Sequence, residues 1–205
     1  MALVRTQDEF LGRGVKQEKS EDGRRRRGQD NRARIVSAML EIIQGGEVSP
    51  GAEQVAERAE VGLRTVFRHF SDMDSLYSEM SEVIEAEMRA VVDQPFKAAD
   101  ARGRVIELIE RRGAVFEKIG PFKRASEALR HRSRFLDGDS DRLAAALRQI
   151  LKRELPEDVA SDPLKVEALD LLLSWESWAR LRREQGLSPA RARKVLEAAV
   201  KTLLG

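Results

Sequence analysis

From Asp30 onward, the apolar residues of this 205-residue chain recur at the spacing of an α-helix. Ile35, Met39 and Ile43, for example, fall at i, i+4 and i+8, on one stripe of a helix. No stretch alternates apolar and polar residues over the length of a strand. The pattern therefore predicts an all-α fold without a sheet.

Capping residues, prolines and glycines divide this helical pattern into segments. We expect helices over about 30–44, 50–59, 62–69, 72–92, 100–119, 122–132, 140–155, 163–186 and 189–204. Ser49-Pro50 is expected to open the second helix, because Ser is a good N-cap and Pro suits the first helical position. Gly120-Pro121 is expected to end the fifth.

Composition excludes several classes of protein. The chain has no Cys, so it has neither disulfides nor thiolate metal sites. It has no apolar run near the ~20 residues that span a bilayer, and its polar N-terminus is unlike a secretion signal. We therefore expect a cytoplasmic protein with no membrane partner. The sequence gives no reason to expect a cofactor or a metal site.

Basic charge is concentrated near the N-terminus, although the net charge of the whole chain is only +2. Six arginines stand against one acid, Asp30, within residues 24–34. They are Arg24, Arg25, Arg26, Arg27, Arg32 and Arg34. We interpret residues 1–29 as a flexible basic arm. It is either a solvated tail or a segment whose arginines contact DNA phosphates or a minor groove.

Residues 52–77 read as two short helices joined by a tight turn and followed by a longer helix. In the second short helix, Leu63, Val66 and Phe70 share an inner face, and Phe67 lies at its boundary. The outer face carries Arg64, Thr65, Arg68 and His69. Arg can bind guanine edges, and the others can hold phosphates or meet a thymine methyl.

Two interpretations of this outer face compete. Arg64 and Arg68 could simply be an i, i+4 solvated surface on a core helix. Two helices of about two turns each, however, bury too little apolar surface to be explained by stability alone. The context therefore favours a DNA-binding helix-turn-helix, with Gly62 at the start of its second helix.

The string Ala59-Glu60-Val61-Gly62, followed by Thr65-Val66-Phe67-Arg68-His69-Phe70 and Asp74-Ser75-Leu76, resembles the DNA-binding domain of TetR-type transcriptional repressors. The similarity covers about residues 33–80. It implies a DNA-binding domain at 30–76 and a helical ligand-binding and dimerisation domain at 77–205. It also implies a homodimer on a pseudo-palindromic operator, released by a small-molecule effector. Carried over by position, the DNA-facing residues are Arg64, Thr65, Phe67 and His69.

The chain departs from the family pattern at four positions. Glu60 replaces a turn Gly, which costs about 1 kcal/mol if the backbone there is left-handed. Arg64 replaces a small residue and adds a base-reading donor. Phe67 and Met73 replace a Tyr and a Lys that hold phosphates. The Arg24–Arg27 run could compensate for those two contacts, and deleting residues 1–27 would test this through the salt dependence of operator affinity.

The C-terminal region supplies the candidate effector-binding residues. They are Phe116, Phe122, His131, Trp175 and Trp178. Each aromatic residue has an alternative role in core or dimer packing, and His131 lies among arginines that could be a solvated helix end. An effector site for the aromatic residues would be an apolar pocket with few polar groups. The cationic cluster of His131 and its neighbouring arginines would instead suit an anionic effector.

An all-α enzyme is one rival class. A di-iron bundle needs Glu-x-x-His pairs, and neither His69 nor His131 has a Glu three residues before it. No Ser-His-Asp set, phosphate loop or zinc motif is recognisable. A second rival is an architectural DNA-binding protein without an effector, which the nearly neutral total charge disfavours.

Overall fold

The computed structural model describes residues 28–205, and every regular element among them is a helix. The prediction of an all-α fold is confirmed for this part of the chain. After an N-terminal helix that includes residues 28–44 come α2 (Ala52–Arg58), α3 (Leu63–His69), α4 (Met73–Val92), α5 (Ala101–Leu129), a 3-10 turn η1 (Arg130–Arg132), α6 (Arg134–Glu154), α7 (Glu157–Ala160), α8 (Pro163–Leu172), α9 (Trp175–Ala179), a π-helical turn η2 (Arg180–Glu184) and α10 (Pro189–Leu204).

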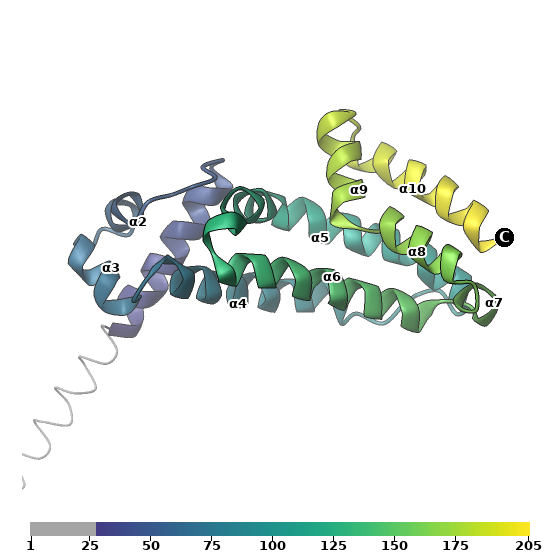
Figure 1. The fold of residues 1–205 in the computed structure, drawn as a ribbon, viewed down its shortest axis with the longest axis horizontal. Coiled ribbons are helices and arrows are strands. Elements are labelled where there is room, and N and C mark those ends of the chain that lie inside the picture. Colours follow the sequence, from purple (N-terminus) through teal and green to yellow (C-terminus); the bar gives the residue numbers. More distant parts are fainter. Residues whose placement is uncertain (1–27) are drawn as a thin grey trace, which may run out of the picture.

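The molecule is elongated, with the N-terminal helix, α2 and α3 at one end (Figure 1). Helix α4 leads away from that end and packs against α5 and α6. Helices α8, α9 and α10 lie towards the other end, where α9 and α10 pack on α5 and α8 packs on α6 and α10. Helix α4 is therefore the element that runs from the short helices to the long ones.

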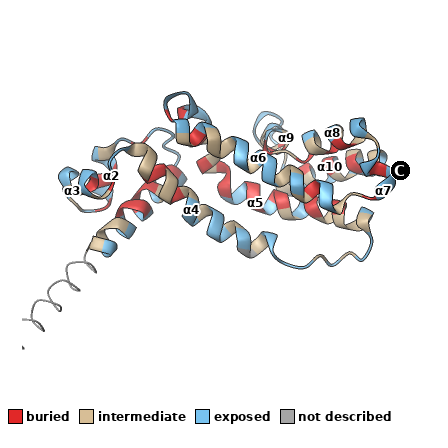
Figure 2. Ribbon diagram, turned by 60° about the horizontal axis from the view of Figure 1, so that its bottom comes forward, coloured by how far each residue is buried: buried red, intermediate tan, exposed pale blue. Residues whose placement is uncertain are grey.

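Helix α5 forms the centre of the core. Thirteen of its 29 residues are buried, and they do not keep to one stripe. A helix that is apolar around much of its circumference has to be covered on several sides. Figure 2 shows the buried residues gathered along α5, with α6 and α8–α10 exposing their outer faces.

The predicted break at Gly120-Pro121 is wrong, because α5 runs through it to Leu129. Pro121 has no N–H to donate inside the helix, which ordinarily costs ~3 kcal/mol. The neighbours Ile119, Gly120 and Phe122 are all buried. Their burial stabilises the helix across the proline, an example of tertiary packing overriding local propensity.

The start of the next long helix is also six residues earlier than predicted. Helix α6 begins at Arg134 because the Ser133 hydroxyl accepts a hydrogen bond from the Leu136 N–H at 3.1 Å. Ser133 is buried, so this cap is not exposed to competition from water. Gly138 lies inside the helix rather than before it.

The predicted single helix over 163–186 is divided at Leu173-Ser174. Ser174 caps α9 by accepting from the Ser177 N–H at 3.2 Å. At the end of α8, the Leu173 carbonyl accepts a hydrogen bond from Arg112 of α5 at 2.8 Å. A cation satisfies a free carbonyl at a helix C-terminus. A partner from elsewhere in the chain thus fixes where α8 ends.

Other helix starts are confirmed. Asp72 caps α4, and Ser188 caps α10 with Pro189 in the first turn. Ser49-Pro50, in contrast, does not open α2. Its N-cap is Gly51, whose N–H is bound by the Gln54 side chain at 2.8 Å.

Candidate functional site

Helices α2 and α3 are joined by a turn whose backbone is left-handed at Glu60, with φ of 53°. Glu60 is the non-glycine residue with positive φ among the described residues. Gly62, in contrast, has an ordinary extended backbone as the N-cap of α3. The turn thus has a left-handed backbone, which favours glycine, at a position that this chain fills with Glu.

Replacing Glu60 with Gly is expected to stabilise the protein by about 1 kcal/mol, because glycine adopts a left-handed backbone without steric cost. The ion pair that would be lost, with Arg34 at 3.5 Å, joins a glutamate that is 86% exposed and is worth little. Thermal unfolding should show Tm higher by about 2–4 °C. Glu60→Ala, which removes the charge but keeps the strain, should leave Tm unchanged; an equal rise in both variants would contradict the strain argument.

Two arginines of the N-terminal helix hydrogen-bond to the C-terminal ends of the short helices α2 and α3. Arg34 donates to the Ala59 carbonyl at 2.6 Å, at the end of α2. Arg32 donates to the His69 carbonyl at 2.7 Å, at the end of α3, and its guanidinium lies 4.5 Å from the Phe70 ring centre. Both cations satisfy carbonyls at helix C-termini. In the sequence, both arginines belong to the basic cluster of residues 24–34, and nothing local indicates that they bind the ends of α2 and α3.

The inner face of α3 is held by Val66 and Phe70, each only 2% exposed. Leu63, predicted to share that face, is exposed. Its position at the first residue of α3 explains this, because the turn before it does not cover it.

The outer face of α3 presents Arg64, Phe67 and Arg68 to solvent, and Phe67 is 52% exposed. Thr65 and His69 flank them and are half-buried. Neither arginine forms an ion pair with any residue of the described chain. Both guanidinium groups are thus available to an incoming anion. The predicted residues Arg24–Arg27 lie outside the described residues.

His69 differs from its neighbours because its Nε2 atom is buried without a hydrogen-bond partner. Burial, followed by repulsion from Arg68 and Arg32, lowers the pKa of His69 below its ordinary value of 6.5, against a smaller opposing effect of Glu79. The folded state therefore favours the neutral imidazole.

Stability is consequently expected to fall as the pH drops below about 6.5, because protonation of His69 is easier in the unfolded chain. The stability contribution is fully present above the unfolded-state pKa and is lost in acid. His69→Gln should flatten this part of the pH profile in chemical denaturation between about pH 7 and pH 5. An identical slope in the wild type and the variant would contradict it.

A cavity of about 380 Å³ lies between α4, α5 and α6. Its volume is within the range of small-molecule sites. Most of its wall is apolar. The apolar lining residues are Met80, Ile84, Met88 and Val92 of α4, Phe96 of the connection between α4 and α5, Leu108, Val115, Phe116, Ile119 and Phe122 of α5, and Leu136, Leu143, Ala146, Leu147 and Ile150 of α6. The shape and lining suit a largely apolar small molecule.

The structure brings two of the five predicted effector residues, Phe116 and Phe122, onto this cavity. His131 is exposed in η1 and does not line it. Trp175 and Trp178 belong to α9, which packs against α5, and both side chains are buried. Trp175 meets the edge of Phe116 with ring centres 5.8 Å apart, and it borders a second cavity of about 70 Å³.

Each tryptophan has a close partner on α5. A Cβ added at Gly113 would lie 2.8 Å from the Trp178 ring, so the glycine permits this contact. The indole N–H of Trp178 donates to Glu117 at 2.9 Å, and Arg182 binds the same carboxylate at 2.7 Å. These contacts favour the packing role for both tryptophans.

Arg112 is the buried cation of the cavity wall, at 5% exposure. It donates to the carbonyls of Leu147 in α6 and Leu173 after α8. Burial lowers its pKa to about 10, which leaves it charged at neutral pH. Sequence reasoning did not single out Arg112, since an arginine within a charged helix gives no signal of being buried.

No family model matches the chain, and no curated protein is similar enough to be a relative. Among the described residues, no helix is long and apolar enough to cross a membrane, and no cluster of His, Cys, Asp and Glu is arranged to hold a metal ion. The resemblance to TetR-type repressors therefore rests on the residues of α2, α3 and the start of α4.

Proposed function

We propose that this protein is a sequence-specific DNA-binding transcriptional regulator of the TetR type that works as a homodimer and responds to a small molecule. The observation that carries the proposal is the outer face of α3. Its two arginines are exposed and unpaired among the described residues, whereas the back of the helix is buried and braced. A rigid helix with free donors on one side is suited to the major groove.

The C-terminal helices support a homodimer. Helix α8 exposes Leu164 and Leu171, at 81% and 66% of their surface, and α10 exposes Val195. Leu164 and Leu171 are seven residues apart and therefore lie on the same side of α8. Large exposed aliphatic side chains on neighbouring helices fit an interface in which two copies form a four-helix bundle.

Helix α4 offers a route by which a ligand can act on α3. Its cavity-lining residues start at Met80, and the preceding residue, Glu79, binds Arg32 at 2.5 Å. Arg32 in turn holds the last carbonyl of α3. A shift of α4 on ligand binding would therefore move the α3 helices of the two protomers. Their separation would then no longer match one DNA turn of ~34 Å. By linkage, ligand and operator would weaken each other equally.

Selection of bound fragments from a random duplex pool tests the proposal. The full chain is expected to enrich a pseudo-palindromic site, because a two-fold symmetric dimer reads two half-sites. An architectural DNA-binding protein would retain DNA without enriching a sequence, and an enzyme without affinity for DNA would enrich nothing. Either of these results would overturn the proposal.

A further inference from the structure

One hydroxyl group among the residues that line the cavity between α4, α5 and α6 has no hydrogen-bond partner in the described structure. Ser126, on α5, is 9% exposed, and its hydroxyl is buried without a hydrogen-bond partner in the described structure. Buried hydroxyls ordinarily find partners, because an unmet hydrogen bond is costly. Ser126 is also among the residues that line the cavity, so its hydroxyl is a candidate donor to a bound molecule.

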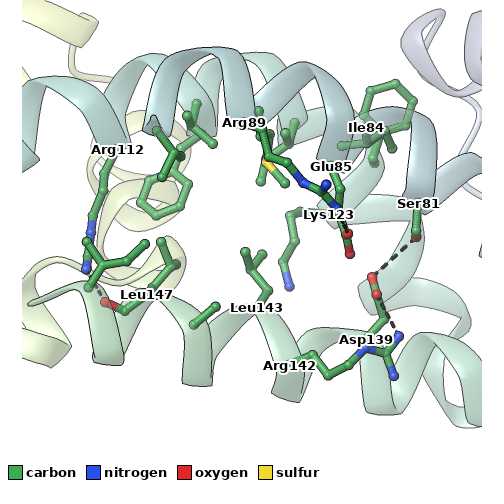
Figure 3. Close-up of a pocket in the computed structure, with 18 of the residues that line it drawn as sticks. Ser81, Ile84, Glu85, Arg89, Arg112, Lys123, Asp139, Arg142, Leu143 and Leu147 are labelled. Carbon is green, nitrogen blue, oxygen red and sulfur yellow. Dashed lines mark hydrogen bonds and ion pairs between the residues drawn. The ribbon is translucent and has the colours of Figure 1, made fainter. Parts of the chain in front are cut away.

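A cation lies one turn away on the same helix. Lys123 is three residues before Ser126, so the two side chains share a face of α5. Its ammonium donates to the Ser140 hydroxyl of α6 at 3.3 Å. Figure 3 shows Lys123 pointing into the space between α4 and α6. Lys123, Ser126 and Ser140 thus line one cavity from two helices.

Lys123 differs from the other cations of the cavity wall. Arg89, Arg111, Arg142 and Arg153 each form an ion pair with a carboxylate, and Arg112 is held by two carbonyls. Lys123 has no carboxylate partner among the described residues. The wall has two acids. Asp139 is bound by Arg142 and Ser81, and Glu85 pairs with Arg89 at 3.6 Å.

We propose that this cavity binds a monocarboxylate with an aliphatic body, with the carboxylate held by Lys123, Ser126 and Ser140. The apolar wall takes the aliphatic chain, and the ammonium and two hydroxyls supply donors to the head group. At ~30 Å³ per water-sized group, the cavity holds roughly a dozen non-hydrogen atoms, as in a saturated acid of about ten carbons. The identification of this acid as the effector of a DNA-binding regulator rests on the proposed function.

Calorimetric titration of the full chain, without DNA, tests the ligand class with decanoate, decanol and decylamine. Decanoate is expected to bind at least tenfold more tightly than decanol, and decylamine more weakly than both, because only the carboxylate matches the cation. Saturated acids of about six to fourteen carbons test which chain length the cavity accepts best. Equal binding of the acid and the alcohol, or no binding of any acid, would overturn the proposal.

Variants identify the head-group site. Lys123→Met, which keeps the length but removes the charge, is expected to weaken decanoate binding by about 10- to 100-fold and to leave decanol binding unchanged. Lys118→Met on the same helix is the matched control, because Lys118 does not line the cavity and pairs with Glu87 at 2.8 Å. An equal loss of affinity in both variants, or in neither, would overturn the assignment.

Ser126→Ala separates a binding role from a structural one. Without ligand, the variant is expected to have a Tm higher by about 2–4 °C, because a buried hydroxyl without a partner is removed. It should nevertheless bind decanoate several-fold more weakly. A higher Tm with unchanged decanoate affinity would overturn the role of Ser126. Because these titrations contain no DNA, their outcome is independent of the operator selection that tests the proposed function.

Discussion

Replacing Arg64 and Arg68 together with alanine is expected to weaken binding to a selected operator by roughly 30- to 20,000-fold. Both side chains are exposed on the outer face of α3 and have no ionic partner among the described residues. A bidentate contact between arginine and a base is worth about 1–3 kcal/mol, so two such contacts account for this range. Fluorescence anisotropy at one fixed salt concentration measures the change.

The matched control is Lys152→Ala combined with Arg183→Ala, which removes the same charge from exposed positions on α6 and η2. This variant should bind the operator within a few-fold of the wild type. Thermal unfolding should be unchanged in both double variants, because none of the four side chains is buried. If the control variant lost as much affinity as the α3 variant, net charge rather than α3 would explain the binding.

Trp178→Ala is expected to destabilise the folded protein by about 3–5 kcal/mol, the usual cost of removing a large buried aromatic side chain. Trp178 is 2% exposed, lies against Gly113 and donates its indole N–H to Glu117. Gly113→Ala should cost about 1–3 kcal/mol for the opposite reason, since the added methyl group would lie 2.8 Å from the ring. Urea denaturation at one fixed protein concentration measures both changes.

The double variant tests whether the two residues act on each other. In the Trp178→Ala background, Gly113→Ala should be nearly neutral or stabilising, because the methyl group then partly fills the cavity. A coupling energy of about 1–3 kcal/mol is expected. Additive costs would contradict the close contact between α5 and α9.

The sequence predicts the fold class and most helix starts because these depend on local features. Asp72 and Ser188 cap the helices that follow them, as their side chains allow. Local signals fail where distant residues decide the outcome. Burial of its neighbours carries α5 through Pro121, and Arg112 of α5 satisfies the carbonyl at which α8 ends. Neither effect is visible in the local sequence.

The same distinction applies to the candidate sites. The outer face of α3 follows from helical periodicity, so Arg64 and Arg68 are predictable as exposed residues. Arg32 belongs to the same basic cluster, yet it binds the end of α3 and Glu79 of α4. Aromatic character selects Phe116 as a candidate cavity residue, but it equally selects Trp175 and Trp178, which do not line this cavity. Lys123 and Ser126 have no such signal, since only the packing of α4, α5 and α6 shows that they share one cavity.

The central claim is that a dimer places two copies of α3 on DNA. Footprinting of the full chain on the enriched fragment is its most direct test. The expected result is a discrete protected site with two symmetric halves whose centres lie one DNA turn apart, about 10 base pairs or ~34 Å. The Arg64→Ala and Arg68→Ala double variant should lose this protection at the same protein concentration. Uniform protection along the fragment, or a single unsymmetrical footprint, would contradict the account.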